Sequence, residues 1–209
     1  MSLVWVDRML VDVRGEGDAI VFIHGLGGSV NAWTPLLPAL PNHRCIRIDL
    51  PGAGRSHKAY ALGESTPHGG KLSVAVHADA VRRVCESQGI TRAHVVGHSF
   101  GTIIAQHIAA ETPSLVRSLA LFGALAEPPQ TLRNVMTGRA PVAREQGLFA
   151  IAEGTSEFSL SVSSKQAQPV TVNVFKRGNA GNPGDPAPRR FLRCVTGETR
   201  PEWTKTSGR

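Results

Sequence analysis

The segment at residues 93–102, AHVVGHSFGT, constrains the fold more than any other part of the chain. Val95 and Val96 belong to a short β-branched run that predicts a buried strand, and an apolar run typical of a helix extends from residue 102 to residue 110. The pattern Gly-x-Ser-x-Gly lies between them. A strand, a sharp turn and a helix around this pattern predict that Ser99 has a strained backbone conformation and an accessible hydroxyl.

Small residues and a helix start surround this serine. Gly97 and Gly101 stand two positions before and after Ser99, where such a turn brings the backbone together and leaves room only for very small side chains. The amide of Phe100 falls in the first turn of the helix, where it can donate to an oxyanion beside Ser99 with the help of the helix dipole. The context therefore predicts a nucleophile elbow. The pattern alone, in a chain with 22 glycines, is more often an ordinary turn.

Apolar runs of strand length alternate with segments of helical periodicity along the first 125 residues. We expect strands near 9–13, 19–23, 44–49, 93–97 and 116–123, helices near 33–40, 72–88 and 102–110, and a hairpin turn at 15–18 between the first two strands. Alternating strands and helices predict an α/β fold, with a mostly parallel sheet covered by helices on both faces.

Three glycine-rich loops follow predicted strands, at the sheet edge where sites form in parallel sheets. They are residues 24–28 (HGLGG), residues 49–56 (DLPGAGRS) and the elbow itself. We expect Asp49 to brace its own loop, because it follows the wrong strand to be a catalytic acid.

The segments VFIHGLGG at 21–28 with Trp33, DLPGAGRS at 49–56 and VVGHSFGT at 95–102 together resemble the α/β-hydrolase family over residues ~9 to ~125. The resemblance implies that Ser99 is the nucleophile of an acyl-enzyme reaction on a carboxylic ester or lactone. It implies an oxyanion hole made by the backbone amides of Leu26 and Phe100. It also implies supporting roles around the site for five further residues: His24, Gly25, Gly97, His98 and Gly101. Residues 128–153 are similar to the helical cap of enol-lactonase-like and other small esterase-like members.

The acid and the base of such a triad are harder to place. The family order is serine, acid, histidine, yet the eight histidines are residues 24, 43, 57, 68, 77, 94, 98 and 107, and none follows His107. The expected base is therefore missing. Glu127 stands just past the strand that ends near Gly123, where some members carry their acid; the alternative is an exposed residue that opens the cap.

The resemblance implies a core at 1–127 and a helical cap at 128–171, and a change of composition near residue 172 marks a basic tail at 172–209. The tail carries eight Lys or Arg and three acids, hence most of the formal net charge of +7, and its composition predicts disorder. We expect either an out-of-frame or replaced terminus on a truncated hydrolase whose last strands are missing, or a natural basic tail. Without those strands, residues 116–123 would form an unpaired sheet edge.

Composition also limits the other function classes. The sequence shows no signal peptide, no membrane-length apolar run, no phosphate-binding loop and no metal-ligand spacing among Cys45, Cys85 and Cys194. We therefore expect a cytoplasmic protein without cofactor or metal that acts on a small molecule and binds neither membrane nor nucleic acid. The alternative is a catalytically incomplete protein of the same fold that serves as a binding module or has no activity. A third reading, binding of nucleic acid or anionic surfaces by the tail, depends on charge alone.

Overall fold

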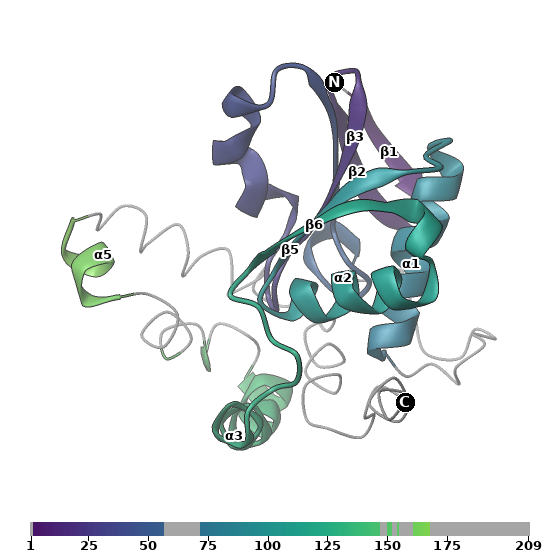
Figure 1. Cartoon of the computed structure of the whole chain (residues 1–209). Helices are drawn as coiled ribbons and strands as arrows, with labels where there is room; N and C mark the ends of the chain where they lie inside the picture. The colour runs from purple at the N-terminus through teal and green to yellow at the C-terminus, as the bar shows by residue number, and fades with distance from the viewer. Residues whose placement is uncertain (1, 57–71, 147–149, 152–153, 155–160, 168–209) are drawn as a thin grey trace, which may run out of the picture.

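A six-stranded sheet forms the centre of the molecule (Figure 1). The computed structural model describes residues 2–56, 72–146, 150–151, 154 and 161–167. The strands lie in the order β1-β2-β4-β3-β5-β6, and β3, β4, β5 and β6 run parallel. Their bounds are β1 Ser2–Val6, β2 Met9–Arg14, β3 Asp18–Ile23, β4 His43–Ile48, β5 Ala93–His98 and β6 Val116–Phe122. The predicted mostly parallel α/β sheet is confirmed.

The hairpin predicted at residues 15–18 is wrong. β2 pairs antiparallel with β4, and β3 lies on the far side of β4, between β4 and β5. The apolar run of β3 gains a neighbour on each side in this position, as expected for a strand buried on both faces. Gly15 (φ 75°) and Gly17 (φ 101°) carry the chain across the start of β4, where a Cβ atom on either would meet backbone oxygens of Asn42 or His43.

The hairpin at this edge of the sheet lies one strand earlier. β1 pairs antiparallel with β2, and Val6 faces Met9 across a two-residue turn. Asp7 (φ 48°) and Arg8 (φ 64°) both have positive φ, the geometry of a turn that matches the twist of a hairpin. Neither residue is a glycine or an asparagine, so the usual sequence signal for this turn is absent.

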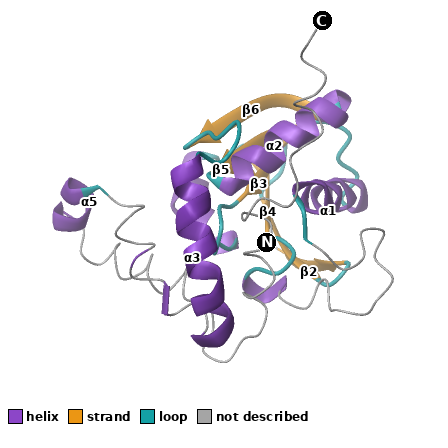
Figure 2. Ribbon diagram, turned by 90° about the horizontal axis from the view of Figure 1, so that it is seen from below, coloured by secondary structure: helices purple, strands orange, loops and turns teal. Residues whose placement is uncertain are grey.

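Helices cover the two faces of the sheet unequally (Figure 2). α1 (Val74–Ser87) and α2 (Phe100–Glu111) pack on one face and share the larger hydrophobic core with alternate residues of β2, β3, β4 and β5. The opposite face is covered, in the described part of the chain, by η1 (Val30–Ala39), whose Trp33 packs on Phe22 with ring centroids 5.1 Å apart. η1 is a 3₁₀-helix that contains Pro35 and Pro38, and neither proline can donate a backbone hydrogen bond.

The remaining helices are short, apart from one. They are η2 (Gly54–Ser56), η3 (Pro113–Leu115), α3 (Gln130–Gln146) and α5 (Val162–Ala167). The predicted helix at 72–88 is confirmed; it begins after Ser73, whose hydroxyl accepts from the amide of Val76. No helix within the described residues is long and apolar enough to span a membrane. Cys45 and Cys85 are buried free thiols, and the predicted tail at 172–209 lies outside the described residues.

β6 lies at the end of the strand order and pairs with β5 alone among the described strands. Among the described strands, β6 thus stands where the sequence analysis expected a sheet edge. Leu119 and Phe122 on this strand are 38% and 51% exposed, unusual for large apolar side chains in the sheet of an α/β protein.

Candidate active site

The turn between β5 and α2 has the geometry that the sequence predicts. Ser99 has φ 51° and ψ −117°, a conformation rare for a residue with a side chain and one that costs about 1–3 kcal/mol. Two neighbours hold it there: the Ser99 amide donates to the carbonyl of Phe122 at 2.9 Å, and the hydroxyl of Thr102 donates to the Ser99 carbonyl at 2.6 Å. The Ser99 side chain is half-buried at the end of the strand.

The glycines around Ser99 allow three backbone segments to meet. A Cβ atom on Gly97 would lie 2.6 Å from the carbonyl oxygen of Gly101, and one on Gly101 would meet the carbonyl oxygen of Ile23. A Cβ atom on Gly25 would lie 3.2 Å from the Cβ atom of Ser99. The loop that follows β3 therefore packs directly against the elbow, and any larger side chain at these positions would push the two apart.

Two backbone amides lie in the segments that meet here. Phe100 begins α2, so its amide lies at the positive end of the helix dipole. Leu26 lies in a turn closed by a 3.0 Å hydrogen bond from the Gly28 amide to the Gly25 carbonyl, and its side chain packs against the main core. The fold thus brings both candidate oxyanion donors to the elbow region, while their role in stabilising an oxyanion stays a prediction.

His24 is fully buried and both of its ring nitrogens are engaged in loop contacts. The Leu50 amide donates to its Nε2 at 3.1 Å, which assigns the proton to Nδ1, and Nδ1 donates to the Gly25 carbonyl at 2.7 Å. Burial lowers the pKa of His24, so the ring is neutral. His24 therefore links the loop after β3 to the loop after β4 and has no nitrogen left for proton transfer.

Asp49 ties the same two loops together from the end of β4. Its Oδ1 accepts from the amide of Val30 at 2.6 Å, and its Oδ2 accepts from the amide of Arg55 at 2.8 Å. The carboxylate is 1% exposed, and the backbone hydrogen bonds offset the cost of burying it. These contacts agree with the bracing role expected from the position of Asp49 in the sequence.

A buried ion pair near this loop escaped the sequence analysis. Arg47 is 1% exposed, and its Nη2 lies 2.8 Å from Oδ2 of Asp12 on the neighbouring strand β2. The sequence signal that could have revealed the pair is the alternation of side chains along β2 and β4, which turns Asp12 and Arg47 inward. Without the strand order, however, the sequence does not reveal that β2 and β4 are neighbours.

The six histidines of the described chain do not supply a base in contact with Ser99. None of them forms a hydrogen bond to the Ser99 hydroxyl within the residues that the structure describes. His98 precedes Ser99 and is exposed, and its Nδ1 would lie 3.0 Å from a Cβ atom on Gly25, with partial burial lowering its pKa. His107 lies on α2 with its Nε2 3.1 Å from Oε1 of Glu111. His57 and His68 lie outside the described residues.

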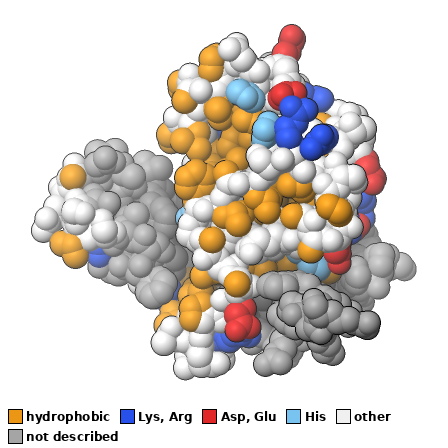
Figure 3. Space-filling view, viewed as in Figure 1, with side chains coloured by type: hydrophobic (Ala, Val, Ile, Leu, Met, Phe, Trp, Pro, Cys, Tyr) orange, Lys and Arg blue, Asp and Glu red, His pale blue; other side chains and the backbone are white. Residues whose placement is uncertain are grey.

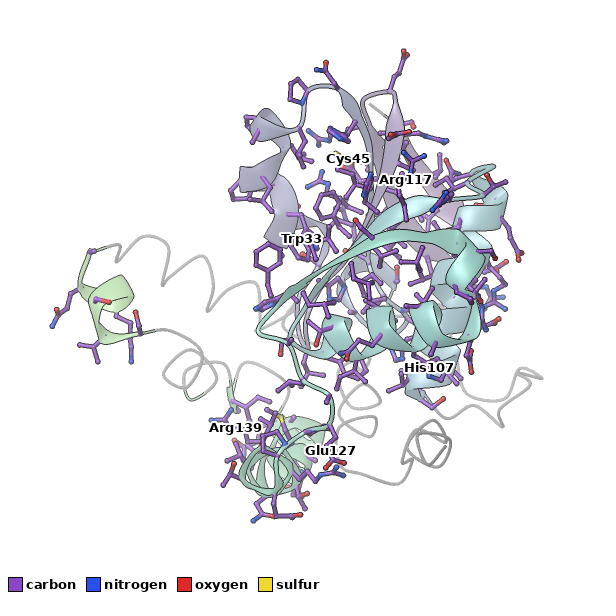
Figure 4. All side chains as sticks on the ribbon, viewed as in Figure 1. Trp33, Cys45, His107, Arg117, Glu127 and Arg139 are labelled. Carbon is purple, nitrogen blue, oxygen red and sulfur yellow. The ribbon has the colours of Figure 1, made fainter. Side chains whose placement is uncertain are left out.

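Glu127 forms an ion pair with an arginine. Its Oε2 lies 3.5 Å from Nη2 of Arg133 on α3, and its side chain is 63% exposed. Figure 4 shows Glu127 beside the start of α3, well separated from His107 on α2. No histidine of the described chain pairs with Glu127, so its role as the acid stays a prediction. Its contacts in the structure are those of the alternative, an exposed residue just before α3.

Comparison with known proteins found one matching family model and several relatives. A family model described as "alpha/beta hydrolase fold" matches residues 18–173. A putative carbamate hydrolase RutD from Variovorax paradoxus is 34% identical over 115 residues, which are 54% of this chain and 40% of the relative. The corresponding protein from Azorhizobium caulinodans is 31% identical over 137 residues, which are 65% of this chain and 48% of the relative. The chain thus spans less than half the length of these two relatives.

Solved structures support the same fold. The enol-lactonase from Burkholderia xenovorans LB400 superposes with a TM-score of 0.74 at 20% identity, covering 93% of this chain and 72% of the other. A hydrolase from Pseudomonas aeruginosa PA01 gives a TM-score of 0.76 at 18% identity with the same coverage. At these identities the likeness establishes the fold alone.

Proposed function

The chain belongs to the α/β-hydrolase fold family, and from this premise we propose that it is a serine hydrolase that cleaves a carboxylic ester or lactone. The observation that carries the proposal is the strained conformation of Ser99 at the end of β5, with Gly25 packed against it and α2 starting at the next residue. A fold accepts such backbone strain where the rest of the structure enforces it, and these places are often functional.

The proposed reaction proceeds in two steps. The Ser99 oxygen attacks the substrate carbonyl carbon, and the amides of Leu26 and Phe100 donate to the resulting oxyanion. The alcohol portion leaves with the proton that Ser99 gives up, and an acyl group remains on Ser99; for a lactone, the protonated alcohol stays attached to the acyl group. Water then attacks the acyl-enzyme and releases the acid. Glu127 is the candidate acid of this scheme, provided that it exchanges its ion pair with Arg133 for a hydrogen bond to the histidine that serves as the base.

The region around residues 128–171 is proposed as a cap over the substrate pocket of a core that spans residues 1–127. α3 supplies most of the described part of this region. The substrate is a small molecule, and neither a cofactor nor a metal enters the scheme. Reduced Cys45 and Cys85 suit a reducing compartment, so we propose a cytoplasmic location.

Carbamates form a neighbouring substrate class. The curated relatives named above are called putative carbamate hydrolases, and one structural neighbour is called an enol-lactonase. Esters, lactones and carbamates all present a planar carbonyl carbon to a serine nucleophile, so one elbow can serve each class. The choice among them depends on the residues that line the pocket.

A non-catalytic binding protein is the second candidate, favoured by one observation. No histidine in the described part of the chain forms a hydrogen bond to the Ser99 hydroxyl, and serine is a weak nucleophile without a neighbouring base. In serine proteases that lack the triad, the oxyanion hole and substrate binding alone retain about 10³–10⁴-fold catalysis over water. The two candidates therefore differ in the rate of Ser99-dependent hydrolysis, which is high for the enzyme and low or absent for the binding protein.

The test compares the wild-type chain with Ser99→Ala on p-nitrophenyl acetate, dihydrocoumarin and a phenyl carbamate. Ser118→Ala is the matched control, because the Ser118 hydroxyl lies 2.8 Å from a histidine nitrogen, Nδ1 of His94, but stands on an exposed strand without an elbow. We expect Ser99→Ala to abolish hydrolysis of at least one substrate and Ser118→Ala to retain it. Binding of a substrate analogue with equal hydrolysis by wild type and Ser99→Ala would favour the binding protein.

A further inference from the structure

The guanidinium of Arg47 lies beneath the loop that connects β3 to η1. Its Nη1 donates to the carbonyl oxygen of Val30 at 2.9 Å and to the hydroxyl of Thr34 at 2.8 Å, and its Nη2 donates to Oδ2 of Asp12 at 2.8 Å. Burial lowers the pKa of Arg47 and the charge of Asp12 opposes that shift. A buried ion pair is weak evidence for stability, because well-packed apolar side chains often replace one without loss. The pair therefore calls for another explanation.

Two side chains at the end of β4, Arg47 and Asp49, hold the backbone of the same residue, Val30. Val30 follows the loop at 24–29 and is the first residue of η1. Arg47 holds its carbonyl, and Asp49 holds its amide at 2.6 Å. At the other end of the loop, Leu50 holds His24 through the 3.1 Å hydrogen bond to Nε2. Residues 47–50 at the end of β4 thus fix the loop at both ends.

This loop carries one of the two proposed oxyanion donors. Leu26 lies within it, and Gly25 brings the loop against the Cβ atom of Ser99. Oxyanion stabilisation depends on the distance from donor to oxyanion, and a misplacement of about 1 Å costs on the order of 100-fold in rate. A contact that fixes the end of the loop can therefore act on catalysis without touching the substrate.

We propose that Arg47, with its charge balanced by Asp12, is a positioning residue that holds the oxyanion loop in register with Ser99 through the carbonyl of Val30. This inference rests on the proposed serine-hydrolase function. The competing explanation is a structural one, in which Arg47 only anchors η1 to the sheet.

The first experiment compares Arg47→Met with a matched control, Arg44→Met. Arg44 stands at the other end of β4 and donates from Nη1 and Nη2 to the backbone carbonyl and side-chain Oε1 of Gln88, at 2.9 and 3.0 Å, far along the strand from the loop. In Arg47→Met, Asp12 keeps Arg14 as an ion-pair partner, with Nε 3.0 Å from Oδ1, so its carboxylate stays compensated.

Two readouts separate positioning from stability. Amide hydrogen exchange of peptides covering residues 24–32 reports the loop directly, and p-nitrophenyl acetate hydrolysis reports the site. For Arg47→Met we expect faster exchange in these peptides and a kcat about tenfold lower, with KM changed less than about twofold. For Arg44→Met we expect wild-type exchange in the loop and wild-type kcat, whatever its melting temperature.

The double variant Asp12→Leu/Arg47→Met protects the test against a variant that simply folds poorly. It replaces the buried pair by apolar side chains, which should recover the melting temperature relative to Arg47→Met. Under the positioning proposal, kcat stays low and loop exchange stays fast in the double variant, because no group holds the Val30 carbonyl. Recovery of kcat together with the melting temperature would overturn the proposal and support the structural explanation.

The exchange readout also keeps this inference apart from the proposed function. If the wild-type chain shows no Ser99-dependent hydrolysis, the serine-hydrolase proposal fails, and the exchange data still decide whether Arg47 fixes the loop. Faster exchange at 24–32 in Arg47→Met then upholds the anchoring step. Unchanged exchange in Arg47→Met contradicts the inference whether or not the chain is an enzyme.

Discussion

The end of β4 and the strand β6 both contact the candidate site, and they do so in opposite ways. Residues 45–50 are all buried, and the side chains of Arg47 and Asp49 hydrogen-bond to the backbone of the neighbouring loop. β6 has a mostly exposed burial pattern and touches the elbow through one backbone hydrogen bond, from the Ser99 amide to the Phe122 carbonyl. The oxyanion side of the site is thus fixed by buried polar contacts, while the other side relies on a strand with one partner among the described strands.

The surface reflects this difference. Figure 3 shows hydrophobic side chains gathered on this face of the molecule. Leu119 and Phe122 of β6 are among the exposed large apolar residues, as is Leu36 of η1, which is 40% exposed. Large exposed apolar side chains on an edge strand favour association with other chains. The site therefore has one side held by the buried contacts at the end of β4 and another side formed by the exposed strand β6.

The largest difference in stability is expected between a glycine packed against the loop after β3 and a glycine on α3 with open space around it. Gly101→Ala places a methyl group against the backbone carbonyl oxygens of Ile23, the last residue of β3, and of His24 in the loop that follows, and should cost about 3 kcal/mol or more. Gly138→Ala on α3 meets no atom within 4 Å and should stabilise the helix by up to about 1 kcal/mol. Urea unfolding of the two variants measures both effects. Equal and small effects would mean that the elbow packs loosely.

A buried histidine that packs against the loop after β4 should make stability depend on pH. His77 of α1 is fully buried, its Nδ1 donates to the carbonyl of Ser73 at 2.7 Å, and its Nε2 lies 3.3 Å from the carbonyl of Pro51. Burial lowers the pKa of His77 to about 4. A folded-state pKa below the unfolded value of about 6.5 means that the unfolded chain binds the proton more tightly. Stability should therefore be complete above about pH 6.5 and fall by up to about 3 kcal/mol towards pH 4.

Urea midpoints across this pH range, measured for wild type and His77→Asn, check this prediction. The variant should show a shallower fall between pH 6.5 and pH 4, because one of the buried titrating groups is gone. His24, whose pKa burial also lowers, should account for part of the remaining slope. Identical slopes for the two proteins would contradict the assignment to His77.

The smallest effect on stability is expected at the open edge. Leu119 is 38% exposed, so Leu119→Lys should change the free energy of unfolding by no more than about 0.5 kcal/mol. The added charge should nonetheless reduce self-association of the chain, as lysines do on natural edge strands. Sedimentation velocity over a range of concentrations measures this. A wild-type chain that is monomeric at every concentration would show that β6 does not mediate self-association.

Local patterns explain what the sequence predicted well. The elbow, with Gly97 and Gly101, and the helix over 74–87 are encoded within a few residues, so the motif and the helical periodicity were sufficient. The parallel sheet followed from the alternation of such segments. The mostly apolar run of β6 indicated a strand, and its place at the edge followed from the family resemblance.

Long-range pairing explains what the sequence did not predict. The Asp12–Arg47 ion pair depends on β2 lying beside β4, and the expected hairpin at 15–18 would have placed β2 beside β3 instead. His24 and Asp49 were expected to support their loops, but their partners in the neighbouring loops depend on strand ends that meet at one edge. The catalytic base was not located in the sequence, and no described residue supplies one at Ser99.

The most direct test of the central claim is whether Ser99 is an activated nucleophile. Intact-mass measurement of the whole chain after incubation with a fluorophosphonate should show a single adduct, which peptide mapping places on Ser99. The adduct should be absent from Ser99→Ala and retained by Ser118→Ala. A wild-type chain that stays unmodified, while a known serine hydrolase in the same reaction is labelled, would contradict the account of this site as a catalytic one.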